Sequence, residues 1–144
     1  MKKILVVLRH QNSLQIVENF LNEKGMYGIY VVLDPVELPE LTAFALKTIE
    51  SAIASGVDAV VIGTKVYDDI KQEKTDPPLR LIEFLELLQT YGIGKTPICM
   101  THLAVIPHDL IRKIRNLGMN IGFVENDNLK SDGMKNLGPL ILGI

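Results

Sequence analysis

Five short apolar runs recur along the chain, each bounded by polar or turn-forming residues. The runs are 3–8 (KILVVL), 28–33 (GIYVVL), 57–63 (VDAVVIG), 97–101 (PICMT) and 120–125 (NIGFVE). Short runs of this kind, with several Val and Ile side chains, are typical of strands that are buried on both faces of a sheet. The pattern therefore predicts five buried strands.

Four longer stretches between these runs have the three- and four-residue spacing of apolar positions that indicates helices. They span residues 12–25, 39–56, 76–94 and 107–118. Asn12 followed by Gln15, and the pair Asp76-Pro77, are typical of helix starts. Glycines close the stretches, as is usual just beyond the last turn of a helix.

The alternation of strands and helices fixes the fold class. Consecutive strands joined by helical crossovers lie parallel in one sheet, because such crossovers are right-handed. The expected fold is therefore α/β, a three-layer, doubly wound, flavodoxin-like sheet of five parallel strands in the order 2-1-3-4-5. We expect one domain over residues 1–144.

In sheets of this class, ligands bind beyond the carboxyl ends of the strands. The sequence places several cations and histidines there. The candidate ligand-binding residues are Arg9, His10, Asp34, Thr64, Lys65 and His102. Cations beside helix N-termini suit an anionic ligand. One hypothesis is therefore a small-molecule-binding protein, or an enzyme acting on an anionic ligand at this edge.

The composition limits the classes of binding partner and the cellular compartment that we expect for this protein. The net charge is −2, so nothing in the overall charge favours nucleic acid or an anionic membrane. A single cysteine, Cys99, excludes an internal disulfide and fits a reducing cytoplasm. The five apolar residues before Arg9 are too few for a signal peptide or a membrane span.

The sequence contains no G-x-G-x-x-G, Walker or G-x-S-x-G pattern. Zinc needs three or four converging ligands, whereas His10 and His102 come from strands that the third strand separates. We therefore expect no metal, no cofactor and no catalytic residue, which favours a protein that is not an enzyme.

The connection 64–78 (TKVYDDIKQEKTDPP) is longer than most loops between a strand and a helix. Long loops at this edge of a sheet serve as lids or docking surfaces. The alternative is a solvated insertion without a specific role. Arg112, Lys113 and Arg115 form a small basic helix face, which we interpret as a solvated face rather than a nucleic-acid contact.

Over roughly residues 2–126, the order of segments resembles the receiver domain of response regulators. The matching segments are KKILVV with NSLQIVENFLNEKG, then VDAVVIG, PICMTH and GMNIGFVEN. The resemblance implies a regulatory role in signalling, exerted through contacts with other proteins.

The same resemblance shows which residues stand where this family carries its phosphorylation chemistry. The acidic pair that binds magnesium falls on Leu8 and Arg9, and the phosphorylated aspartate falls on Gly63. None of these residues has a carboxylate, so neither metal binding nor aspartyl phosphorylation is expected. The resemblance thus implies a pseudo-receiver.

Two further positions complete this degenerate phosphorylation pocket. The hydroxyl residue of the family falls on Thr101 or His102, because a one-residue strand shift exchanges them, and its lysine falls on Glu125. We expect an ion pair between Arg9 and Glu125, with His10 or His102 nearby. The alternative is that both charged groups point to water, where a pair contributes little.

The C-terminal segment departs from the family, which has a full fifth helix here. Gly133, Gly138 and Pro139 interrupt any long helix, so the last helix is degenerate. The apolar tail 137–144 would pack over the sheet or join a neighbouring subunit, and we favour a homodimer. The leading interpretation is a non-catalytic, cytoplasmic, receiver-like interaction domain whose partners contact the fourth helix or residues 64–78.

Overall fold

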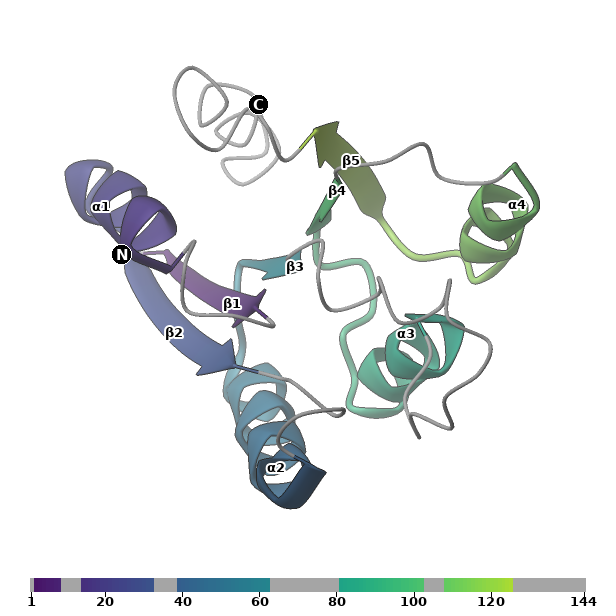
Figure 1. Cartoon of the computed structure of the whole chain (residues 1–144), viewed down its shortest axis with the longest axis horizontal. Helices are drawn as coiled ribbons and strands as arrows, with labels where there is room; N and C mark the ends of the chain where they lie inside the picture. Colours follow the sequence, from purple (N-terminus) through teal and green to yellow (C-terminus); the bar gives the residue numbers. More distant parts are fainter. Residues whose placement is uncertain (1, 9–13, 33–38, 63–80, 103–107, 126–144) are drawn as a thin grey trace.

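The computed structural model describes residues 2–8, 14–32, 39–62, 81–102 and 108–125 (Figure 1). These residues form one five-stranded sheet with helices on both faces. The strands are β1 (Lys3–Leu8), β2 (Tyr27–Val32), β3 (Ala59–Ile62), β4 (Ile98–His102) and β5 (Ile121–Glu125). Their order is β2-β1-β3-β4-β5, and every neighbouring pair is parallel. The predicted fold class and strand order are confirmed.

Four helices connect the strands, as the periodicity predicted. They are α1 (Leu14–Glu23), α2 (Pro39–Ser55), α3 (Leu81–Thr90) and α4 (His108–Asn116). Figure 1 shows α1 on one side of the sheet and α2, α3 and α4 on the other. Helices on both faces give the three layers of a doubly wound domain.

Glycine ends α1 and α3 by the same motif. Gly25 and Gly92 have φ angles of 68° and 97°, in the left-handed region that side chains disfavour. The amide of the residue after each glycine donates back to a carbonyl five residues earlier, from Met26 to Leu21 and from Ile93 to Leu88. This is the Schellman arrangement, and it satisfies carbonyls that the helix end leaves free.

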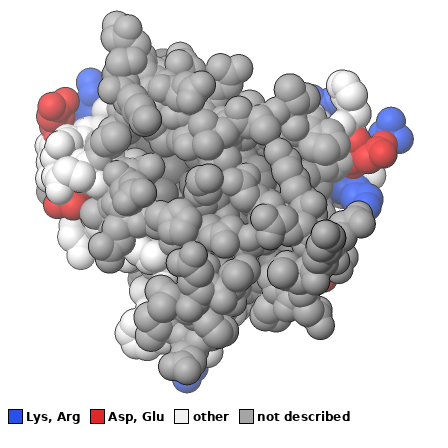
Figure 2. Space-filling model, in the orientation of Figure 1, with Lys and Arg blue, Asp and Glu red and all other residues white. Residues whose placement is uncertain are grey.

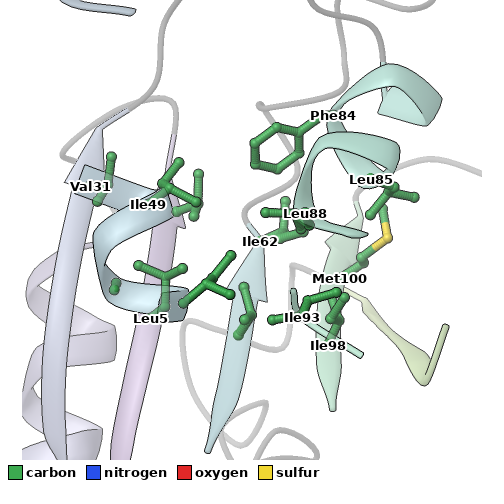
Figure 3. Close-up of a cluster of buried hydrophobic side chains, with 14 of the residues drawn as sticks. Leu5, Val31, Ile49, Ile62, Phe84, Leu85, Leu88, Ile93, Ile98 and Met100 are labelled. Atoms are coloured by element: carbon green, nitrogen blue, oxygen red, sulfur yellow. The ribbon is translucent and has the colours of Figure 1, made fainter. Parts of the chain in front are cut away.

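The larger hydrophobic core lies between the sheet and the layer of α2, α3 and α4 (Figure 3). Alternate residues of each strand point to this side, for example Leu5 and Val7 of β1. Phe84, Leu85 and Leu88 of α3 meet them from the helix layer. Because these side chains exclude water, they hold the helices against the sheet.

The smaller core lies on the opposite face, under α1. Ile4 and Val6 of β1 pack there against Val17, Phe20 and Leu21 of α1. The same six-residue strand therefore supplies both cores through the period-two alternation of its side chains. This explains why the sequence of β1 reads as a continuous apolar run.

The third strand is shorter than the apolar run 57–63 predicted, because it begins at Ala59. Asp58 precedes it and makes two hydrogen bonds with Lys3. The amide of Lys3 donates to the Asp58 carboxylate at 2.8 Å, and the amide of Asp58 donates to the carbonyl of Lys3 at 2.8 Å. This exposed aspartate thus positions the start of β3 beside the start of β1.

The degenerate last helix and the apolar tail 137–144, both predicted from the sequence, lie outside the described residues.

Candidate functional site

The carboxyl ends of the strands form one edge of the sheet, because all neighbouring strands are parallel. The strands do not end level. Ile62, the last residue of β3, pairs with Met100, so Thr101 and His102 continue β4 past the end of β3. There they pair with Val124 and Glu125 of β5. At this edge, the ends of β4 and β5 therefore extend as a pair past the end of β3, and we call this pair of strand ends the two-stranded step.

This step brings together two of the predicted site residues. His102 and Glu125 are register partners at the ends of β4 and β5, and Thr101 is one residue earlier. Leu8 ends β1, which β3 separates from β4. The side chains of these four residues are not among those that the structure describes, so the choice between Thr101 and His102 as the pocket residue stays a prediction.

The remaining predicted site residues lie outside the described residues. They are Arg9, His10, Asp34, Gly63, Thr64 and Lys65. The predicted ion pair between Arg9 and Glu125 therefore stays a prediction, as does any role of the connection 64–78. The structure does place the strands β1, β2 and β3, which precede these residues in the sequence.

The last described interior residues of β1, β3 and β4, next to this edge, are apolar and buried. Val7, Ile62 and Met100 each have no exposed surface and belong to the larger core. The residues that precede them on these strands are also buried, namely Val6, Val61 and Cys99, so none of these described positions brings a charged side chain to the edge from below. Chemistry at this edge must therefore come from residues at or beyond the strand ends.

The single thiol of the chain is not available for such chemistry. Cys99 of β4 is buried under α1, and this burial raises the pKa of its thiol from 9.0 to about 12. The thiol is therefore protonated at neutral pH and is a poor nucleophile. Within the described residues, no group of three or more His, Cys, Asp or Glu side chains could hold a metal ion.

The charged residues that the structure describes lie on the helices. Arg112, Lys113 and Arg115 are exposed on α4, in its last two turns. Figure 2 shows basic and acidic side chains together at the rim where Figure 1 places α4. Cations at a helix C-terminus interact favourably with its dipole, so part of their role is structural.

Sequence reasoning did not identify the residues that fix the end of α4. Gln89 and Lys95, at the end of α3 and in the turn after it, donate hydrogen bonds to backbone carbonyls just beyond α4. Their partners are 28 and 23 residues away in sequence. A polar pair at that separation gives no periodic signal, so only the fold brings these groups together.

Comparison with known proteins gives a structural likeness only. No protein-family model matches the chain, and no curated protein matches it. Among solved structures, the chain is similar to the Vibrio cholerae chemotaxis protein CheY4, with a TM-score of 0.62 and 18% sequence identity. The likeness covers 97% of this chain and 98% of that one.

In the part of the chain that the structure describes, no helix is long and apolar enough to cross a membrane. At 18% identity, the likeness to CheY4 is evidence about architecture. The element order, the parallel register and the helices on both faces agree with it. The chain has the flavodoxin-like fold of a CheY-like receiver domain.

Proposed function

We propose that this chain is a receiver-like regulatory domain that works through protein contacts and is not phosphorylated on aspartate. One observation carries the proposal. The fold matches a chemotaxis receiver over 97% of the chain, yet the residue that follows β3 in the sequence is Gly63. At the end of this strand, receiver domains carry the aspartate that accepts the phosphoryl group.

The chemistry of the neighbouring positions supports the same proposal. Aspartyl phosphorylation needs a carboxylate oxygen that attacks phosphorus and a magnesium ion that neutralises the phosphate oxygens. Leu8 ends β1 and Arg9 follows it, so the pair that would bind magnesium contains no carboxylate. Glu125 ends β5 where a lysine would contact the phosphoryl group, and its charge is opposite to that of lysine.

The proposed partners are proteins, and the proposed contact surfaces are the exposed face of α4 and the connection 64–78. Arg112, Lys113 and Arg115 on α4 would select an acidic partner surface and raise its association rate. The proposal includes a single domain over 1–144, a cytoplasmic location, and a homodimer that buries the apolar tail 137–144. It assigns no nucleic-acid or membrane ligand and no cofactor.

The phosphorylation half of the proposal can be tested with a small-molecule phosphodonor. The purified chain is incubated with acetyl phosphate and magnesium, and its intact mass is measured beside a receiver domain that retains the strand-3 aspartate. We expect no phosphoryl adduct on this chain under conditions that modify the control. A phosphoryl group that hydroxylamine removes and that peptide mapping places on an aspartate of this chain would contradict the proposal.

The interaction half can be tested by native mass spectrometry, followed by a denaturing mass on the same sample. We expect a protein dimer with no additional mass. A bound small molecule or metal that is lost on denaturation would instead support an anionic-ligand site at the strand ends. The variant His102→Ala would then be expected to weaken its retention.

The role of α4 needs a variant that changes charge without changing burial. Reversing Arg112 and Lys113 to Glu alters two exposed side chains and is expected to slow association with an acidic partner by roughly tenfold or more at low salt. The matched control is Lys24→Glu with Lys47→Glu, which makes the same change in net charge at two exposed positions outside α4. Equal effects of the two double variants would contradict a specific role of α4.

A further inference from the structure

The helix α4 is attached to the fold differently from α2 and α3. Among the side chains of α4 that the structure describes, Ile114 is buried and Ile111 is half-buried, and the others are exposed. By contrast, α3 buries Phe84, Leu85 and Leu88 completely or almost completely. Apolar burial is the main term that holds a helix against a sheet. The described part of α4 therefore has the weaker hydrophobic attachment.

Just beyond α4, Leu117 packs against the larger core, and polar contacts add to this attachment. The amide nitrogen Nε2 of Gln89 donates to the carbonyl of Leu117 at 2.7 Å, and Nζ of Lys95 donates to the carbonyl of Gly118 at 2.6 Å. A third, longer contact of 3.5 Å runs from Nδ2 of Asn120 to the carbonyl of Lys95. We call these three side chains and their acceptors the α4 clasp.

The clasp satisfies carbonyls that a helix end cannot pair within itself. Leu117 and Gly118 form the turn after α4, where their own amides bond back to Ile114 and Arg115 at 3.1 Å. Their carbonyl oxygens point outward from this turn and accept the two donors from the α3 side. The positive charge of Lys95 also lies at the negative end of the α4 dipole.

All three contacts of the clasp are exposed, so water competes for every donor and acceptor. Exposed hydrogen bonds on long side chains open far more readily than a packed apolar core. From these observations we infer that α4 opens as a unit separate from the sheet, and that the α4 clasp sets how often it opens. This property belongs to the isolated chain and holds whether or not a partner uses α4.

Amide hydrogen exchange of the full chain tests the inference directly. In the wild type, the amides of 112–118 are expected to exchange faster than those of β1 and β3, because local opening exposes them without unfolding the sheet. Equal protection of α4 and these strands would overturn the inference before any variant is made.

The variants Gln89→Ala and Lys95→Ala remove the two short contacts of the clasp. Each is expected to speed the exchange of 112–118 by roughly fivefold, which at 1.4 kcal/mol per factor of ten corresponds to about 1 kcal/mol. Amides of β1 and β3 are expected to change by less than about twofold. An unchanged α4, or an equal acceleration in the strands, would refute the role of the clasp.

Thr90→Ala is the matched control on the same helix. The hydroxyl of Thr90 donates to the carbonyl of Glu86 at 3.1 Å, an exposed side-chain contact that stays within α3. Its removal is expected to leave the exchange of 112–118 unchanged. A comparable acceleration in this control would mean that α3, rather than the clasp, governs α4. Because exchange is measured without a partner, the result is independent of the proposed function.

Discussion

The strands β3 and β4 bury larger side chains on one face of the sheet than on the other. Under α2 and α3, β4 contributes Ile98 and Met100, and α3 adds Phe84. Under α1, the described interior positions of β3 and β4 include Ala59 and Cys99, which are much smaller. The strands are the same on both faces, so the difference lies in alternate positions of one sequence. Consecutive residues of a buried strand thus pack into two separate cores on opposite faces of the sheet.

This contrast indicates where the fold is most sensitive to lost volume. A large side chain deep in the larger core is surrounded on every side and leaves a cavity when it is removed. A side chain at the rim of the smaller core has neighbours that can move into the space.

The largest effect is expected from one substitution made on each face. Phe84 is 1% exposed in the larger core, whereas Phe20 of α1 is 9% exposed in the smaller core. The Nζ atom of Lys24 lies 6.0 Å from the centre of the Phe20 ring. We expect Phe84→Ala to lower the free energy of unfolding by about 4 kcal/mol and Phe20→Ala by about 2–3 kcal/mol. Urea denaturation of both variants measures the two values, and the reverse order would contradict the contrast.

A second prediction concerns the edge of the sheet on the α1 side. The ring of Tyr30 lies over Gly28 on the same side of β2, so a Cβ atom at Gly28 would overlap the ring. Gly28→Ala must displace Tyr30 and is expected to cost about 2 kcal/mol. In Tyr30→Leu, which lacks the ring, the same change is expected to cost much less, and a double-mutant cycle measures the coupling. Additive effects would show that the ring is not the obstacle.

The smallest effect is expected from the Cys99 thiol under α1. Its pKa is raised by burial from 9.0 to about 12, so the folded chain keeps this proton at a pH where the unfolded chain loses it. The associated stability is complete below about pH 9 and falls as the pH rises toward 12. Between about pH 8 and about pH 10, the wild type is expected to lose on the order of 1 kcal/mol more stability than Cys99→Ala.

The control for this prediction is built into the comparison, because all other titrating groups are the same in both proteins. Denaturation at the two pH values gives the difference in slope. Identical slopes would show that the thiol is accessible in the folded chain. A thiol reagent provides an independent check, since it should modify Cys99 only when the chain unfolds.

The sequence predicted the framework well because apolar periodicity and helix-end glycines are local signals. The strand 3–8 was predicted with its observed bounds, and Gly25 was correctly predicted to end α1. The start of β3 was predicted two residues early, because Val57 resembles a strand residue while Asp58 is engaged with Lys3. Such a contact joins distant parts of the chain and leaves no trace in a short window.

The candidate site could be predicted only as a set of positions. The order of strands predicted which residues end at one edge, and the register confirmed that β4 and β5 end together there at His102 and Glu125. Which side chains meet at that edge depends on loops whose sequences carry no periodic pattern. The α4 clasp was missed for the same reason, since Lys95 and Gly118 meet only after the sheet has formed.

The position of β1 between β2 and β3 has a consequence for biosynthesis. A ribosome makes Leu8 about 50 residues before Ala59, and at about 5–20 residues per second this interval lasts on the order of 3–10 s. During that time the side of β1 that will pair with β3 has no partner strand. A nascent chain therefore presents an unpaired strand edge to the cell for seconds, and slow translation before Ala59 would lengthen the period in which chaperones must protect it.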